Sequence, residues 1–151
     1  MTVQKGVLPN ARIIDIRRNP LDCCFSNFKL LFVQGHPSAS SLEGMASYYR
    51  DYIRLMRHLD SALPGRVHRI IYEELVDDLE GETRRLLAHI GVDFDPACLD
   101  FHRTERAVAT ASSEQVRRPL NRDGIGAWRK YEPWLEPLVE ALGDLLQTYR
   151  A

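Results

Sequence analysis

The sequence has little lysine, little cysteine and no long apolar run. Lysine stands at only three positions, Lys5, Lys29 and Lys130, and the 20 basic residues are outnumbered by 21 acidic ones. A net charge of −1 produces no bulk positive field, so a nucleic-acid partner is not expected unless arginines gather on one face. No run of 18 apolar residues exists, so no transmembrane helix is predicted.

The cysteines and histidines form no recognisable framework. Cys23, Cys24 and Cys98 are too few, and odd in number, for a set of disulfides. Neighbouring residues on a helix point in different directions, which disfavours a Cys23–Cys24 bridge. The first residues lack the apolar core of a signal peptide, so we expect a cytoplasmic protein with reduced thiols. None of the five histidines pairs with another at i, i+4 and no CxxC occurs, so no metal site is predicted.

The length and the hydrophobic pattern predict one α/β domain over residues 1–151. Hydrophobic residues make up 44% and charged residues 27%, which is ordinary for a globular protein. Apolar runs at 12–17 and 67–72 are typical of strands, and helical periodicity favours helices elsewhere. The helices are expected at 20–33, 42–62 and 73–90, with a break near Gly81, at 96–102 and, interrupted by Pro133 and Pro137, at the carboxyl end.

The junction between the first strand and the first helix carries the clearest chemistry. Asn19 and Pro20 are a helix start, with Asn as N-cap and Pro at the first helical position. Arg17 and Arg18 therefore lie at the carboxyl end of a strand and beside a helix N-terminus, where anionic ligands bind. Ser26 on that helix adds a hydroxyl, which favours a phosphate or sulfate site. The alternative is a buried strand whose arginines pair with nearby carboxylates.

Three segments, in the right order, strengthen the first interpretation. They are Arg18-Asn19-Pro20-Leu21-Asp22 with Ser26 four residues further on, Tyr72-Glu73-Glu74-Leu75-Val76, and Ser112 to Asn121 followed by Gly126 to Tyr131. Together they resemble the 3′-phosphate-binding and nucleotide-binding segments of sulfotransferases that use 3′-phosphoadenosine-5′-phosphosulfate (PAPS). The last segment is most similar to the bacterial and protein-tyrosine branch of that superfamily.

The resemblance implies a binding role for residues in all three segments. Arg18 and Ser26 would hold the 3′-phosphate, and Tyr72 would stack on the adenine or bond to it, unless it is simply a half-buried strand aromatic. The adenosine and 3′-phosphate would be wrapped by the third segment, through Ser112, Ser113, Gln115, Arg117, Pro119, Asn121 and Arg122. Ala127 stands where relatives often carry a basic residue, so we expect Arg117, Arg122 or Arg129 to supply that charge.

One element of the family pattern is missing from the sequence. The glycine-rich loop that cradles the 5′-phosphosulfate does not occur here, and the usual catalytic base belongs to the same region. We therefore expect a partial P-loop-type parallel sheet flanked by helices, which keeps the 3′-phosphate and adenosine half of a sulfotransferase. PAPS would be the co-substrate, with a hydroxyl or amine acceptor, and the chain alone would be inactive. The alternative is a non-catalytic nucleotide-bisphosphate-binding or protein-interaction module, which could be a homodimer.

Overall fold

A parallel pair of strands forms the sheet of this protein. The computed structural model describes residues 10–29, 41–104 and 115–151. Strand β1 (Ile13–Arg17) pairs with β2 (Val67–Ile71) in a register that sets Ile13 opposite Val67 and Arg17 opposite Ile71. Parallel strands need a long crossover, and helices α2 and α3 lie within this one. The predicted α/β class, a small parallel sheet flanked by helices, is confirmed.

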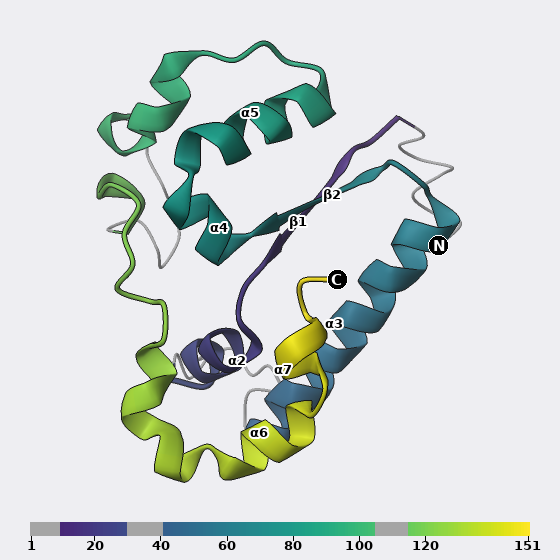
Figure 1. Cartoon of the computed structure of the whole chain (residues 1–151), viewed down its shortest axis with the longest axis vertical. Helices are drawn as coiled ribbons and strands as arrows, with labels where there is room; N and C mark the ends of the chain where they lie inside the picture. The colour runs from purple at the N-terminus through teal and green to yellow at the C-terminus, as the bar shows by residue number, and fades with distance from the viewer. Residues whose placement is uncertain (1–9, 30–40, 105–114) are drawn as a thin grey trace.

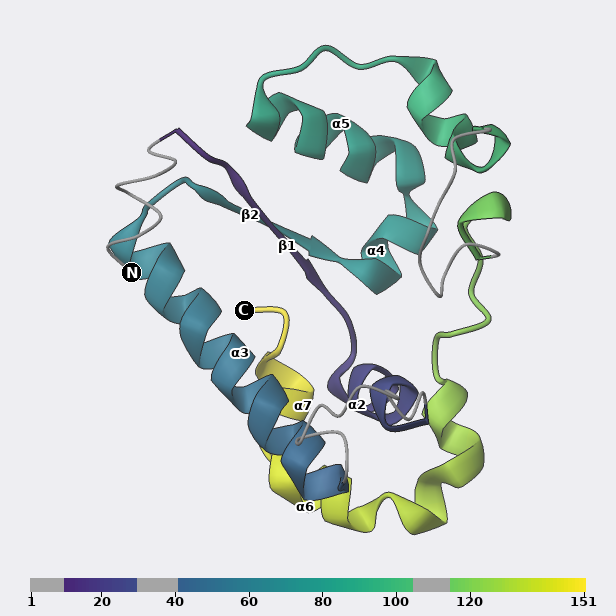
Figure 2. The ribbon, with the colours of Figure 1, turned by 180° about the vertical axis from the view of Figure 1, so that it is seen from behind.

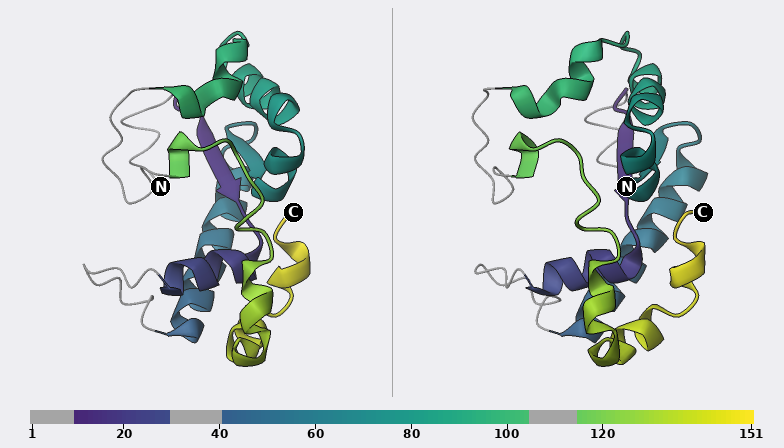
Figure 3. Two further views of the ribbon diagram at one scale, coloured as in Figure 1. Left: turned by 90° about the vertical axis from the view of Figure 1, so that its left-hand side faces the viewer. Right: turned by 60° about the vertical axis from the view of Figure 1, so that its left-hand side comes forward.

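Helices make up most of the remaining described chain. Their bounds are α2 (Pro20–Lys29), α3 (Leu42–Ala62), α4 (Tyr72–Asp77), α5 (Leu79–Ile90), the 3-10 helices η2 (Pro96–Arg103), η3 (Gln115–Arg117) and η4 (Ala127–Trp134), then α6 (Glu136–Leu142) and α7 (Leu145–Thr148). Figures 1 and 2 show α5 on one side of the strand pair, with α3 and the C-terminal helices on the other. In Figure 3 the chain after η3 runs along one side of the molecule towards α2.

Local capping explains where the two crossover helices begin. The side chain of Asn19 accepts hydrogen bonds from the backbone N–H groups of Leu21 at 3.0 Å and Asp22 at 3.3 Å, as the sequence predicted. The hydroxyl of Ser41 accepts one from Gly44 at 2.9 Å, and α3 then runs over the whole predicted range. The expected last turns of the first helix, beyond Lys29, lie outside the described residues.

Two predicted boundaries after β2 were wrong. Tyr72 is the first residue of α4 rather than the last of the strand. The break between the next two helices lies at Asp78, not at Gly81, because the Asp78 carboxylate accepts the Gly81 N–H at 2.9 Å and caps α5. The predicted end at Gly91 is confirmed: this glycine has a φ of 78°, a left-handed cap that other residues rarely adopt.

The main hydrophobic core lies between α2, α3 and the C-terminal helices. The leucines of the last helices are buried here, where they pack against the apolar faces of α2 and α3. The buried members are Leu21, Cys24, Phe25, Met45, Ala46, Tyr49, Ile53, Leu135, Leu138, Leu142 and Leu145. Because α2 is part of this core, its N-terminus is fixed relative to the carboxyl end of β1.

The two faces of β1 have opposite character. Asp15 and Arg17 are buried and form an ion pair of 2.7 Å. Ile14 and Ile16, on the other face, are 44% and 62% exposed. Adjacent residues of a strand point to opposite faces, so the covered face of this strand is charged and the uncovered face is apolar.

Candidate functional site

A cleft of about 580 Å³ opens beside the carboxyl ends of the two strands. Its walls come from the start and outer face of α2, from the first residue of α4, from η2, and from the chain between η3 and η4. The lining residues are Arg18, Asp22, Phe25, Ser26, Lys29, Tyr72, Phe101, Val116, Arg118, Pro119, Leu120, Asn121, Asp123, Gly124 and Ala127. The cleft thus joins all three segments that the sequence singled out.

Arg18 lines this cleft and contacts residues on two of its sides. One terminal nitrogen donates to the backbone carbonyl of Gly124, and the guanidinium lies over the Tyr72 ring, 5.3 Å from its centroid. A Cβ at Gly124 would stand 2.8 Å from the Arg18 nitrogen, so a larger residue here would displace the end of the Arg18 side chain. The Arg18 Nε is buried and has no hydrogen-bond partner among the described residues. A donor of this kind is available for an acceptor oxygen.

Asp22 connects helix α2 to the start of η4 through hydrogen bonds. Its carboxylate is buried and accepts the Gly126 N–H at 2.7 Å and the Trp128 N–H at 3.4 Å. It also lies 3.8 Å from Arg18. Charge-assisted hydrogen bonds to buried carboxylates are among the stronger ones, so Asp22 holds the far wall of the cleft in place.

Tyr72 is the second connection between the walls. Its hydroxyl donates to the backbone carbonyl of Asn121 at 3.3 Å. Ser26 lies on the α2 wall, and Pro119 and Asn121 lie on the facing wall. Five of the residues predicted to bind therefore line one cleft: Arg18, Ser26, Tyr72, Pro119 and Asn121.

The other five predicted residues have different positions. Arg117 is exposed and does not line the cleft, and Arg122 forms an ion pair with Asp77 on the outside of α4. Gln115 opens η3. The two serines of the third segment, Ser112 and Ser113, lie outside the described residues.

Sequence reasoning assigned no role to several residues of the cleft. Lys29 lies one turn after Ser26 on α2, an i, i+3 spacing that places both on one helix face and could have identified it. Arg118 lines the facing wall, whereas Arg129, which the sequence offered as a source of charge, does not. The positive charge of this cleft therefore comes from Arg18, Lys29 and Arg118, with Ala127 contributing none.

Arg17 has a structural role. Its guanidinium is buried, donates to Asp15, and donates to the backbone carbonyls of Tyr149 at 2.5 Å and Ala151 at 2.8 Å. Asp15 also accepts from the Tyr52 hydroxyl and from Arg69. For Arg17, the structure therefore confirms the alternative interpretation, a buried strand arginine that pairs with a nearby carboxylate.

The two thiols of α2 are poor candidates for chemistry. Burial raises the pKa of Cys23, against the opposing effect of nearby Arg18, and burial raises the pKa of Cys24 to about 12. A thiol with a raised pKa is a weak nucleophile at neutral pH.

Over residues 10–29, 41–104 and 115–151, no three His, Cys, Asp or Glu side chains come together as metal ligands would. The helices described in the same ranges include none that is long and apolar enough to cross a membrane.

Comparison with known proteins identifies the family of this chain. A family model described as "Sulfotransferase family" matches residues 3–96, well over half of the chain. The chain therefore belongs to the sulfotransferase family. It is also 32% identical, over 141 residues, to a protein of Aquifex aeolicus (strain VF5) described as uncharacterized. That alignment covers 91% of this chain but 18% of the relative, so the chain spans less than a fifth of the relative's length.

Proposed function

We propose that this chain provides the 3′-phosphate and adenosine site of a PAPS-dependent sulfotransferase. The observation that carries the proposal is the cleft, in which Arg18, Lys29 and Arg118 face one concave surface together with Ser26 and Tyr72. The three cations outnumber the two carboxylates of the lining, Asp22 and Asp123, and with the Ser26 hydroxyl they suit a phosphate, which has up to two charges and three acceptor oxygens. The unpartnered Nε of Arg18 is a donor that such an anion would satisfy.

Each wall of the cleft has a role in this proposal. Arg18 and Ser26 would hold the 3′-phosphate, with Lys29 as a further cation on the same helix. Tyr72 and Phe101 are the aromatic side chains beside which the base would lie. PAPS would supply the sulfuryl group for a hydroxyl or amine acceptor, and the residues described above would bind and orient the nucleotide.

Thermal unfolding in the presence of adenosine 3′,5′-bisphosphate tests the proposal. Ligand at 100 times its dissociation constant adds about 2.7 kcal/mol to the free energy of unfolding, while 5′-AMP, which lacks the 3′-phosphate, should add little. Lys29→Gln should reduce the shift, since Lys29 is exposed and its loss leaves the core intact. Lys130→Gln is the matched control, because Lys130 is exposed and does not line the cleft. Equal shifts with both nucleotides would contradict a 3′-phosphate site.

The chain by itself is proposed to be inactive in sulfate transfer. Its 151 residues contain no glycine-rich loop of the kind that holds the 5′-phosphosulfate in the family. We also propose, from the resemblance of the third segment, that the chain is nearest to the bacterial and protein-tyrosine branch of the family. An assay with labelled PAPS and a panel of phenols, alcohols and amines should detect no transfer by the purified chain, and robust transfer would refute this part of the proposal.

A second candidate function rests on the apolar face of β1. Ile14 and Ile16 are exposed, and among the described residues β1 pairs on one edge only, with β2. Exposed apolar strand edges favour association with another strand. A protein-interaction module, or a homodimer, would use this surface, and sedimentation of the purified chain over a range of concentrations would detect self-association.

A further inference from the structure

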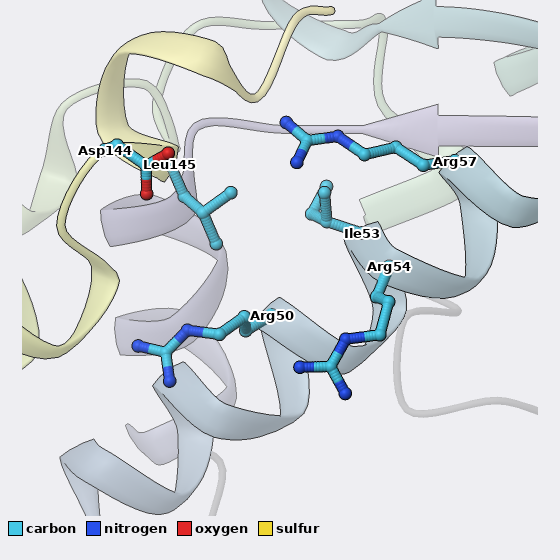
Figure 4. A pocket seen from close by; sticks show the side chains of 6 residues that line it. All are labelled: Arg50, Ile53, Arg54, Arg57, Asp144 and Leu145. Atoms are coloured by element: carbon cyan, nitrogen blue, oxygen red, sulfur yellow. The ribbon is translucent and has the colours of Figure 1, made fainter.

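A second hollow, of about 280 Å³, lies on a different part of the molecule. Figure 4 shows it between helix α3 and the start of α7. Arginines from successive turns of α3 line one side, namely Arg50, Arg54 and Arg57, while Asp144 and Leu145 line the other. None of these residues lines the cleft described above.

The floor of the hollow is apolar and rigid. Ile53 is 1% exposed and Leu145 is 4% exposed, and both belong to the hydrophobic core. Because the core fixes these two side chains, the floor does not depend on a bound molecule for its shape. An apolar floor below charged walls matches the C–H surface of a small molecule that also carries polar groups.

The charged side chains on the rim are incompletely paired. The Arg57 guanidinium and the Asp144 carboxylate have no hydrogen-bond or ion-pair partner among the described residues, although both line the same hollow. Arg54 pairs with Asp51 at 3.2 Å, where both side chains are largely exposed. Arg50 uses one terminal nitrogen on the carbonyl of Ala141, which leaves its other donors available.

We propose that this hollow binds a small hydroxylated anion, a sulfate or phosphate ester of a sugar-like molecule. The Arg57 guanidinium, which has no partner among the described residues, would hold the ester group, since guanidinium groups match its oxygens. Asp144 would accept hydrogen bonds from the hydroxyl groups, and Ile53 and Leu145 would contact the C–H surface. A bare inorganic anion fits less well, because the Asp144 carboxylate would repel it.

Ligand-observed NMR titrations of the whole chain test this assignment. The probes are glucose 6-sulfate, glucose 6-phosphate, glucose and inorganic sulfate. Both esters should bind more tightly than glucose or sulfate alone, and the comparison of the two esters identifies the preferred anion. Arg57→Gln should weaken ester binding about tenfold, as expected for losing one charge-assisted contact. Arg103→Gln, an exposed arginine on η2, should change nothing.

The Asp144→Asn variant distinguishes a specific site for sugar esters from a general attraction of anions to the arginines. This exposed residue makes no side-chain cap on α7, so the substitution should leave the fold intact. The variant should weaken binding of the sugar esters several-fold while inorganic sulfate binds as well as before or better. If the esters instead bind better to Asp144→Asn, or if Arg57→Gln leaves their affinity unchanged, the proposal is overturned. Loss of binding in Lys29→Gln alone would place the esters in the other cleft and also overturn it.

Discussion

Replacing Asp22 with alanine should loosen the cleft and destabilise the whole chain. The carboxylate is 2% exposed and accepts two backbone N–H groups, from Gly126 at 2.7 Å and from Trp128 at 3.4 Å. Hydrogen bonds to charged groups contribute about 1.5–3 kcal/mol each, and the longer of these two contributes least. We therefore expect the free energy of unfolding to fall by about 3 kcal/mol, or roughly 6–12 °C in melting temperature for a chain of this size.

Urea unfolding of matched variants measures this effect. Asp22→Asn keeps the shape of the side chain, but its NH₂ group cannot accept a backbone N–H, so it should restore only part of the loss. Asp77→Asn is the control, because the ion pair of Asp77 with Arg122 is exposed and should contribute less than about 1 kcal/mol. If Asp22→Ala and Asp77→Asn unfold at the same urea concentration, the hydrogen bonds that Asp22 accepts from Gly126 and Trp128 do not stabilise the chain as described.

Three further outcomes are expected. Arg17→Leu leaves the Asp15 carboxylate buried without the closer of its two arginine partners and should cost about 3–5 kcal/mol of stability in chemical denaturation; an effect below about 1 kcal/mol would contradict the burial. Burial, and then the stacked ring of His89, lower the pKa of His68 below 6.5, so the folded state binds fewer protons than the unfolded state. Stability should therefore be full above pH 6.5 and decline as the pH falls towards the lowered pKa, and His68→Phe should flatten that part of the profile. Finally, Ile16→Thr should reduce any concentration-dependent association seen by sedimentation without lowering the melting temperature, because Ile16 is exposed.

The backbone plan could be predicted because its signals are local. Asn19 before Pro20 fixes the start of α2, and Gly91 fixes the end of α5, each through a single capping geometry. The end of β2 was harder, because Tyr72 suits a strand as well as a helix start. Asp78 was overlooked as a cap since Gly81, three residues later, is the more obvious helix breaker.

The content of the cleft could be predicted only in part, because spatial neighbours come from distant segments. The resemblance identified Arg18, Ser26 and Tyr72, which lie near each other in any arrangement of two adjacent parallel strands. Whether Arg117 or Arg118 lines the cleft depends on the rotation of one short segment, which the sequence pattern does not reveal. Phe101 reaches the cleft from η2, a contact that requires the packing of η2 to be known.

The residues proposed to bind the nucleotide also hold the facing wall of the cleft. Arg18 donates to the carbonyl of Gly124, and the Tyr72 hydroxyl donates to that of Asn121. A guanidinium has five N–H donors, so Arg18 can hold the wall and an anion together, and each contact should favour the other. Adenosine 3′,5′-bisphosphate should therefore slow hydrogen exchange of the amides in residues 120–126. Faster exchange there, with a normal thermal shift, would mean that the anion takes the place of the Gly124 carbonyl and opens the wall as it binds.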